Sequence, residues 1–201
     1  ARTEFPTEDF LPENPFVTAS NTTLKINFPN GDLQVNDFAR FRNVKSPVGG
    51  VAISTLQMST TLNGTITDTA TTIDLTDGSQ FPTSGFIVIE KVNAVSGLFE
   101  NEVIEYTGRS THQLTGCTRG TSAPYRGVSP VNTTASSHSS GAKVFGCYKV
   151  VSLNETSVPS TGQPATTTRF DGINVTLTNT ASGTETGGGF QCTIGPINDR
   201  G

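Results

Sequence analysis

The residues best suited to chemistry lie within residues 102–124, which read EVIEYTGRSTHQLTGCTRGTSAP. His112 and Cys117 are five positions apart, and a thiol beside an imidazole can act as a nucleophile. Cys117, however, stands between Gly116 and Thr118 in a turn-like segment, and no helix N-terminus is predicted there to lower the pKa of its thiol. His112 lies in RSTHQ, which is typical of an exposed hairpin tip. We therefore expect a loop histidine and a buried turn cysteine rather than a catalytic pair.

The other candidate sites are incomplete. His138 has no acidic or cysteine partner at metal-ligand spacing. Asp74 and Asp77 match only a fragment of a calcium loop, which favours a structural Asx turn. Glu102 and Glu105 suggest the paired carboxylates of a glycosidase, but they fall on opposite faces of an alternating strand. TETGGGF lacks the lysine and the following helix of a phosphate loop. We expect no catalytic residue, no cofactor and no metal.

The composition predicts many short strands and argues against several classes of partner. Of 201 residues, 33% are hydrophobic and 15% charged, both low for a globular domain, whereas Thr and Gly are abundant. The net charge of −4, without clustered Lys and Arg, disfavours nucleic-acid binding. No apolar run reaches the roughly 18 residues of a transmembrane helix. The first ten residues lack the apolar segment of a signal peptide, so none is expected.

The three cysteines, Cys117, Cys147 and Cys192, are widely spaced and include no C-x-x-C pair. This spacing gives no support to a zinc or redox motif. Buried free thiols are the favoured interpretation, and a single disulfide with one free thiol stays open.

The apolar spacing predicts an all-β chain of antiparallel β-sandwich or barrel-like modules, because no segment keeps helical spacing over three turns. Turns are expected at Asn63-Gly64 and Asp171-Gly172, and an irregularity at Gly146. Phe38 is out of phase with Phe41, which predicts a kink or bulge between them. The expected strands include TLKINF, DFARFRNV, VAISTL, TTIDLTD, GFIVIEKV, NEVIEYTG, AKVFGCYKVVSL and TRFDGINVTLTNT.

Residues 1–20 form a distinct extended arm, because three prolines interrupt any regular element. Two interpretations stay open: the arm docks onto a neighbouring subunit or partner, or it packs on its own domain. The apolar residues proposed for docking are Phe5, Phe10, Leu11, Phe16 and Val17.

Residues 59–142 carry a composite pattern. It has a TTL start, a TTI.L...S.FP.SG.I.I segment, then E.I.YTG and LTGCTRG, and it closes with H..GA.V, which ends at Val144. The chain departs from this pattern mainly by extra residues at KVNAVSGLFEN and YRGVSPV. With these motifs the segment resembles a β-rich module of structural proteins of tailed bacteriophages. The matching residues are Phe81-Pro82, Ser84-Gly85, Glu105 to Gly108, Leu114 to Gly120 and His138 to Val144.

The flanking segments resemble a second phage-type module. Its two halves are similar to GDLQVNDFARFRNVKSPVGG and to YKVVSLNET…TASGTETGGG. The resemblance implies that residues 59–142 form a module inserted at a hairpin tip of a host module made of residues 21–58 and 143–201. It also implies that Gly116, Cys117, Arg119 and Gly120 form a structural turn. The glycines would supply the turn dihedrals, Cys117 would fill a small core space, and Arg119 would bond loop carbonyls.

The resemblance implies a structural virion protein rather than an enzyme. We expect a tail, neck, baseplate or fibre-attachment subunit that assembles with copies of itself and other virion proteins in the bacterial cytoplasm. One alternative is a capsid decoration protein that grips the shell through residues 1–20. A second alternative is a module that binds a host surface glycan or protein. No nucleic acid and no membrane is expected as a partner.

Overall fold

The computed structural model describes residues 9–10, 16–19, 24–27, 33–45, 57–126, 133–158, 168–175 and 191–197. Every regular element in these ranges is a β-strand, and all the strand pairs are antiparallel. The predicted all-β, antiparallel class is therefore confirmed. The strands are β1 (Asp9–Phe10), β2 (Phe16–Ala19), β3 (Leu24–Asn27), β4 (Phe38–Lys45), β5 (Ser59–Thr61), β6 (Ile73–Asp74), β7 (Gly85–Ile89), β8 (Glu102–Tyr106), β9 (Gly108–Ser110), β10 (Gln113–Thr115), β11 (Lys143–Val158), β12 (Thr168–Val175) and β13 (Gln191–Gly195).

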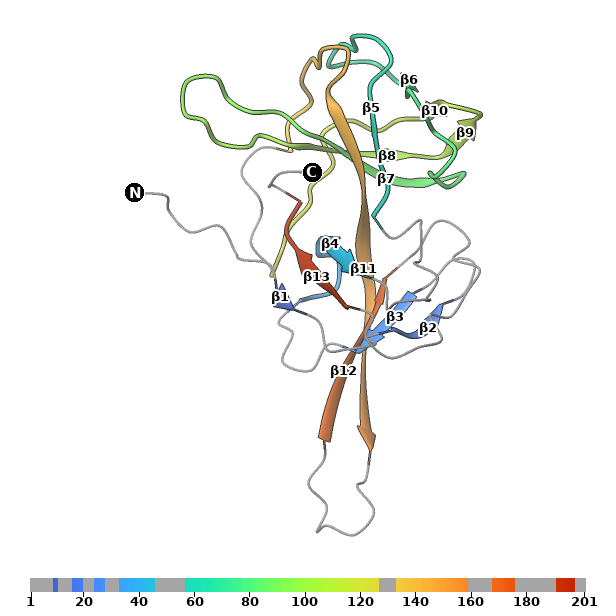
Figure 1. The fold of residues 1–201 in the computed structure, drawn as a ribbon, viewed down its shortest axis with the longest axis vertical. Helices are drawn as coiled ribbons and strands as arrows, with labels where there is room; N and C mark the ends of the chain where they lie inside the picture. Colours follow the sequence, from blue (N-terminus) through green and yellow to red (C-terminus); the bar gives the residue numbers. More distant parts are fainter. Residues whose placement is uncertain are drawn as a thin grey trace.

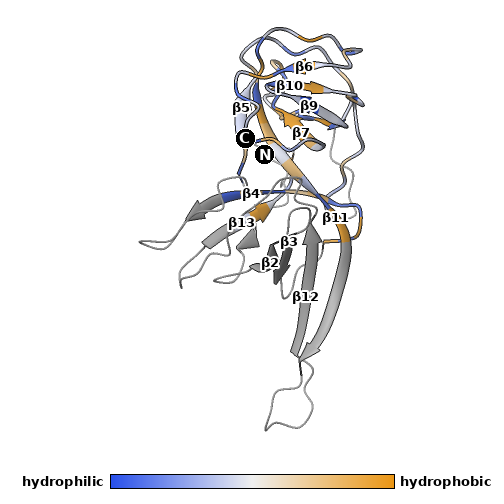
Figure 2. Cartoon of the chain, turned by 90° about the vertical axis from the view of Figure 1, so that its right-hand side faces the viewer, coloured by the Kyte–Doolittle hydropathy of each residue, from blue (hydrophilic) through white to orange (hydrophobic). Residues whose placement is uncertain are grey.

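Strand β11 connects the two halves of the molecule (Figure 1). Its first residues pair with β5 and β7, and its later residues pair with β4 and β12. The main path of the large sheet runs β1-β13-β4-β11-β12-β3-β2, while β6, β10 and β9 form a separate three-stranded sheet. In Figures 1 and 2 the strands β5 to β10 gather around one end of β11, and the remaining strands gather around the rest of it.

The buried apolar residues join these two strand groups. One cluster contains Phe41 and Ile194 from β4 and β13 together with Leu62, Ile87 and Ile104 from the segment around β5, β7 and β8. A second cluster joins Phe38 and Ile197 to Val88 and Val103. Because both clusters cross from one strand group to the other, the hydrophobic effect stabilises the two groups as one packed unit.

Strand β4 explains why its two phenylalanines are out of phase. Phe38 and Phe41 are both buried, and they belong to different core clusters. The strand is therefore covered on both faces, and no kink is needed between these residues. The prediction of a kink or bulge between them is therefore wrong: the pairing is regular from Phe38 to Arg42, and the register with β13 shifts only between Arg42 and Lys45.

Three local predictions are wrong. Asn63-Gly64 is not the tip of a two-residue hairpin, because Asn63 itself bonds to the Asp74 carbonyl and Leu62 is bridged to Leu75, so a long loop separates the paired segments. Asp171-Gly172 is not a turn, because both residues pair with β11 inside strand β12. Gly146 pairs regularly with Ile87, and its lack of a side chain makes room for Met58 instead: a Cβ there would lie 2.5 Å from the Met58 Cε.

The N-terminal arm contributes backbone pairing within the chain. β1 pairs with β13 and β2 pairs with β3, so these two arm strands lie at the two ends of the main sheet path. Phe5, Leu11 and the whole strand predicted for VAISTL lie outside the described residues. None of the described segments forms a helix long and apolar enough to cross a bilayer.

Candidate functional site

The carboxylate of Glu102 is the best-connected buried polar group that the structure describes. Its side chain is 0% exposed, and the strand β8 directs it inward while Glu105, three residues later, is exposed. The predicted opposite orientation of these two glutamates is therefore confirmed. Arg119 donates to both carboxylate oxygens at 2.8 Å, and the backbone N–H of Gly120 donates to Oε1 at 3.0 Å. The Ser136 N–H donates to Oε2 at 3.2 Å.

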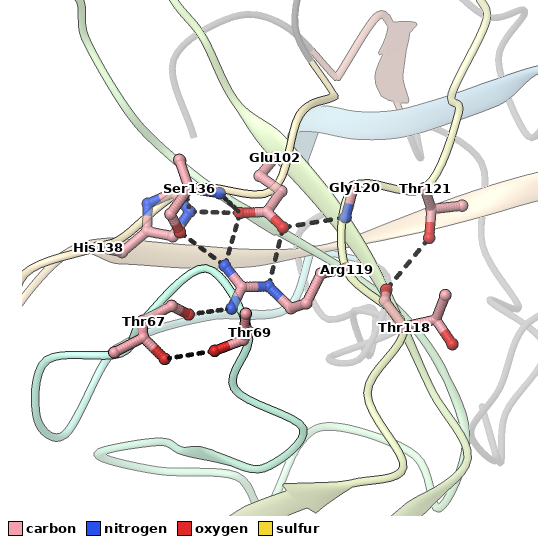
Figure 3. Close-up of polar contacts among 9 residues, drawn as sticks. All are labelled: Thr67, Thr69, Glu102, Thr118, Arg119, Gly120, Thr121, Ser136 and His138. Atoms are coloured by element: carbon pink, nitrogen blue, oxygen red, sulfur yellow. Dashed lines mark hydrogen bonds and ion pairs between the residues drawn. The ribbon is translucent and has the colours of Figure 1, made fainter.

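Arg119 lies in the turn that follows β10, and its guanidinium reaches three segments. Besides its two bonds to Glu102, it donates through Nη1 to the Thr67 carbonyl and through Nη2 to the Ser136 carbonyl at 2.7 Å (Figure 3). A planar guanidinium suits this task because its donors form a rigid fork that matches a carboxylate. The side chain of Arg119 is 7% exposed, so the ion pair with Glu102 is shielded from water.

His138 completes the network from the segment that precedes β11. Its Nε2 lies 2.7 Å from Oε2 of Glu102, and its side chain is 1% exposed. The backbone of His138 pairs with Ile66 through two hydrogen bonds of 3.0 Å. The histidine therefore ties the 133–142 segment both to β8 and to the loop after β5. The sequence did not identify this role, because a lone histidine among serines is typical of an exposed loop.

The network keeps Glu102 ionised. Burial by itself would raise the pKa of this carboxyl group, since a charge is costly away from water. Hydrogen bonds from His138 and Arg119, the positive charge of Arg119 and the Ser136 N–H outweigh burial and lower the pKa of Glu102 to about 2. At neutral pH the site is thus a buried anion whose hydrogen-bonding capacity is filled by protein donors.

The geometry does not match a serine–histidine–carboxylate relay. In such a relay the serine and the carboxylate contact different ring nitrogens of the histidine. Here the Ser136 Oγ, at 3.4 Å, and the Glu102 Oε2, at 2.7 Å, both lie at Nε2 of His138. The described arrangement connects four chain segments, from β8, the 119–120 turn, the 133–138 segment and the loop at Thr67. Its clearest physical role is to hold those segments together.

His112 and Cys117, the two residues considered as a nucleophilic pair, have different surroundings. His112 is exposed between β9 and β10, as predicted, and its Nδ1 accepts a hydrogen bond from the Gly78 N–H at 2.9 Å. Cys117 is buried and free, and burial raises the pKa of its thiol to about 11, which disfavours the nucleophilic thiolate. Cys147 is also a buried free thiol. Among the described residues no three His, Cys, Asp or Glu side chains are placed to hold a metal ion.

The Asp77 turn and the Gly116–Gly120 turn have local structural partners. Asp77 accepts a hydrogen bond from the Ser79 N–H at 2.9 Å, which is the pattern of an Asx turn. Gly116 and Gly120 both have φ of 61°, a left-handed conformation that favours glycine. Cys117 belongs to the main core cluster, and Arg119 bonds two loop carbonyls. The larger role of Arg119, its fork onto Glu102, was not anticipated from the sequence.

Removing the charge of Glu102 should destabilise the fold. Glu102→Gln keeps the shape of the side chain but leaves Arg119 buried without its anionic partner, which should lower the free energy of unfolding by about 3–5 kcal/mol. Glu105→Gln is the matched control, because the same change falls on an exposed residue of the same strand and should have little effect. Urea denaturation of both variants checks this prediction. Equal stabilities would contradict it.

The contribution of Glu102 should disappear in acid. Its pKa is lowered from 4.5 to about 2 on folding, so the folded state disfavours the proton. The associated stability is fully present above about pH 4.5 and is lost as the pH falls toward 2; it is on the order of 3 kcal/mol. The stability difference between Glu105→Gln and Glu102→Gln should therefore shrink over this window. A difference that stays constant down to pH 2 would disprove the assignment.

Gly120 should tolerate a side chain much less well than Gly141. Both have positive φ, 61° and 83°, so alanine should cost about 1 kcal/mol of backbone strain at either position. A Cβ at Gly120 would also lie 2.8 Å from the Thr133 carbonyl oxygen, whereas a Cβ at Gly141 meets nothing within 4 Å. Thermal unfolding should therefore give Gly120→Ala a clearly lower melting temperature than Gly141→Ala. Similar melting temperatures would argue that the 133–136 segment is not held tightly against this turn.

The chain was compared with known proteins in three ways. No family model, no curated protein and no solved structure matches it. The interpretation of the Glu102 network therefore rests on its own geometry, which is that of a buried connection between chain segments.

Proposed function

We propose that the chain is a structural subunit of a tailed-bacteriophage virion that acts by self-assembly in the tail, neck, baseplate or fibre attachment. The proposed role rests on the resemblance of residues 59–142 to a phage structural module. A protein of this kind needs stable, specific contacts rather than a reacting centre. The buried network around Glu102 is consistent with that need, because its contacts connect segments of the chain.

The observation that carries the proposed role is the convergence of three motifs. The E.I.YTG motif begins at Glu102, LTGCTRG contains Arg119, and H..GA.V begins at His138. These three residues lie up to 36 positions apart in the sequence, yet their side chains meet in one hydrogen-bonded cluster (Figure 3). A set of motifs that encodes one buried cluster is what a shared structural module requires, and this supports the phage resemblance.

The pairing of β5 with β11 supports the proposed insertion of residues 59–142 into a host module. Ser59 lies opposite Phe145, and Thr61 lies opposite Lys143, so the two ends of the segment run side by side. Insertion at a hairpin tip needs such adjacent ends, because the host strands must enter and leave at one place.

The N-terminal arm is the proposed contact with other subunits. Its strands β1 and β2 are at the ends of the main sheet path, and an edge strand offers hydrogen-bonding groups to a neighbouring chain. Phe5, Phe10, Leu11, Phe16 and Val17 would then add apolar contacts to that backbone pairing.

Immunogold labelling of intact particles, with an antibody raised against the purified chain, tests the proposed role. Gold at one vertex or along the tail is the expected result, with pre-immune serum as the control. Gold distributed over the head would replace the tail assignment by capsid decoration. Particles that carry the gene but bind no gold would contradict a virion role altogether.

A further inference from the structure

Asn63 and Gly64 form the one asparagine–glycine pair in the ranges that the structure describes. The side-chain amide of an asparagine lies next to the backbone nitrogen of the following residue, and attack by that nitrogen on the amide carbon closes a cyclic imide. Glycine permits this ring closure most readily, because it has no Cβ to obstruct the approach and adopts backbone angles that other residues avoid. Whether the reaction occurs in the folded chain then depends on the surroundings of the pair.

The side chain of Asn63 is free to rotate toward the attacking nitrogen. Asn63 is exposed, and no described residue forms a hydrogen bond with its side chain. Asn93, by contrast, uses both polar atoms of its amide in hydrogen bonds to its own loop and to Glu100. Asn101 is buried and also bonds through both atoms of its amide. Rotation of the amide therefore breaks hydrogen bonds at these two asparagines but none at Asn63.

The backbone nitrogen of Gly64 is accessible as well. A Cβ at Gly64 would meet no atom within 4 Å, and its φ of 112° is a conformation that favours glycine. The Gly64 N–H donates to the hydroxyl of Ser140 at 3.2 Å, in an exposed bond that water can replace. The nitrogen and the amide carbon belong to adjacent residues, so the attack is intramolecular and needs only this local rearrangement.

We propose that Asn63 is a site of spontaneous deamidation in the folded chain. The Gly64 nitrogen loses its proton to water and forms a bond to Cγ of Asn63, and the side-chain nitrogen takes up a proton and leaves as ammonia. Water then opens the succinimide at either carbonyl carbon, which gives aspartate in one case and isoaspartate in the other. The net change consumes one water and releases one ammonia. The reaction involves this chain and water only, so it does not depend on the proposed virion role.

The isoaspartate product would disturb the network around Glu102. The modified residue lies between two fixed points, because Leu62 bonds to the 141–142 segment and Ile66 pairs with His138. In isoaspartate the main chain runs through the side-chain carbon, which lengthens this short link by one methylene. The paired positions on either side then no longer match, and the strain falls on His138, whose Nε2 lies 2.7 Å from the Glu102 carboxylate (Figure 3). Deamidation should therefore loosen this cluster slowly and irreversibly.

Peptide mapping of the aged protein tests the proposed site. The native chain is incubated at mildly alkaline pH, digested with trypsin and analysed by mass spectrometry. Asn63 is the one asparagine of the tryptic peptide 46–91, whereas Asn93 and Asn101 lie in the peptide 92–109. The mass increase that marks conversion of an amide to a carboxylate should appear in peptide 46–91 at least roughly tenfold faster, because its amide is free beside an accessible nitrogen. Equal rates, or a reaction at Asn63 only in the urea-unfolded chain, would overturn the proposal.

Asn63→Gln is the matched control for the structural consequence. It keeps an exposed amide, but ring closure would need a larger ring that forms less readily. Every other asparagine, including Asn30 outside the described residues, is the same in both chains. On ageing, the melting temperature should therefore fall more in the wild-type chain than in Asn63→Gln. Equal falls, with isoaspartate present at position 63 of the wild-type chain, would disprove the effect on the Glu102 network.

Discussion

The structure around β8 depends on one buried anion. A carboxylate removed from water is unfavourable unless protein donors replace the water, and at Glu102 the donors come from Arg119, Gly120, Ser136 and His138. Because two of these donors are backbone N–H groups, the anion fixes the path of the chain as well as the side chains. Residues 133–138 contain few apolar side chains that could pack in a core. The hydrogen bonds to Glu102 are therefore a main reason why this segment holds its conformation.

Strand β11 provides the second constraint, because it pairs with strands of both groups. It begins immediately after the His138 segment, pairs first with β5 and β7, and continues into the pairing with β4 and β12. The apolar clusters follow the same route, since residues of β4 and β13 pack against residues of β7 and β8.

Alternation of apolar residues was enough to predict the strand class and individual strands such as β6, where the buried Ile73 and the exposed Asp74 are followed by the buried Leu75. The same rule failed at β4, because both faces of this strand are buried and its apolar residues therefore do not alternate with polar ones. Turn signals misled at Asn63-Gly64, which is followed by a long loop before the chain pairs back at Asp74, and at Asp171-Gly172, where pairing with β11 overrides local preference. The Glu102–His138 contact spans 36 positions, and neither local pattern nor spacing predicts such a pairing. The one sequence signal for it was the set of three motifs, which named the segments but not their contact.

Hydrogen exchange at the Gly120 and Ser136 amides tests most directly whether the Glu102 anion orders the loops around it. Both amides lie outside the strands, but both donate to the buried carboxylate. The account predicts that they exchange as slowly as the buried backbone of β7 around Val88, because they should open only when the core unfolds. Exchange as fast as that of the exposed Ala94 amide would show that the loops open independently of the core, and would contradict the account.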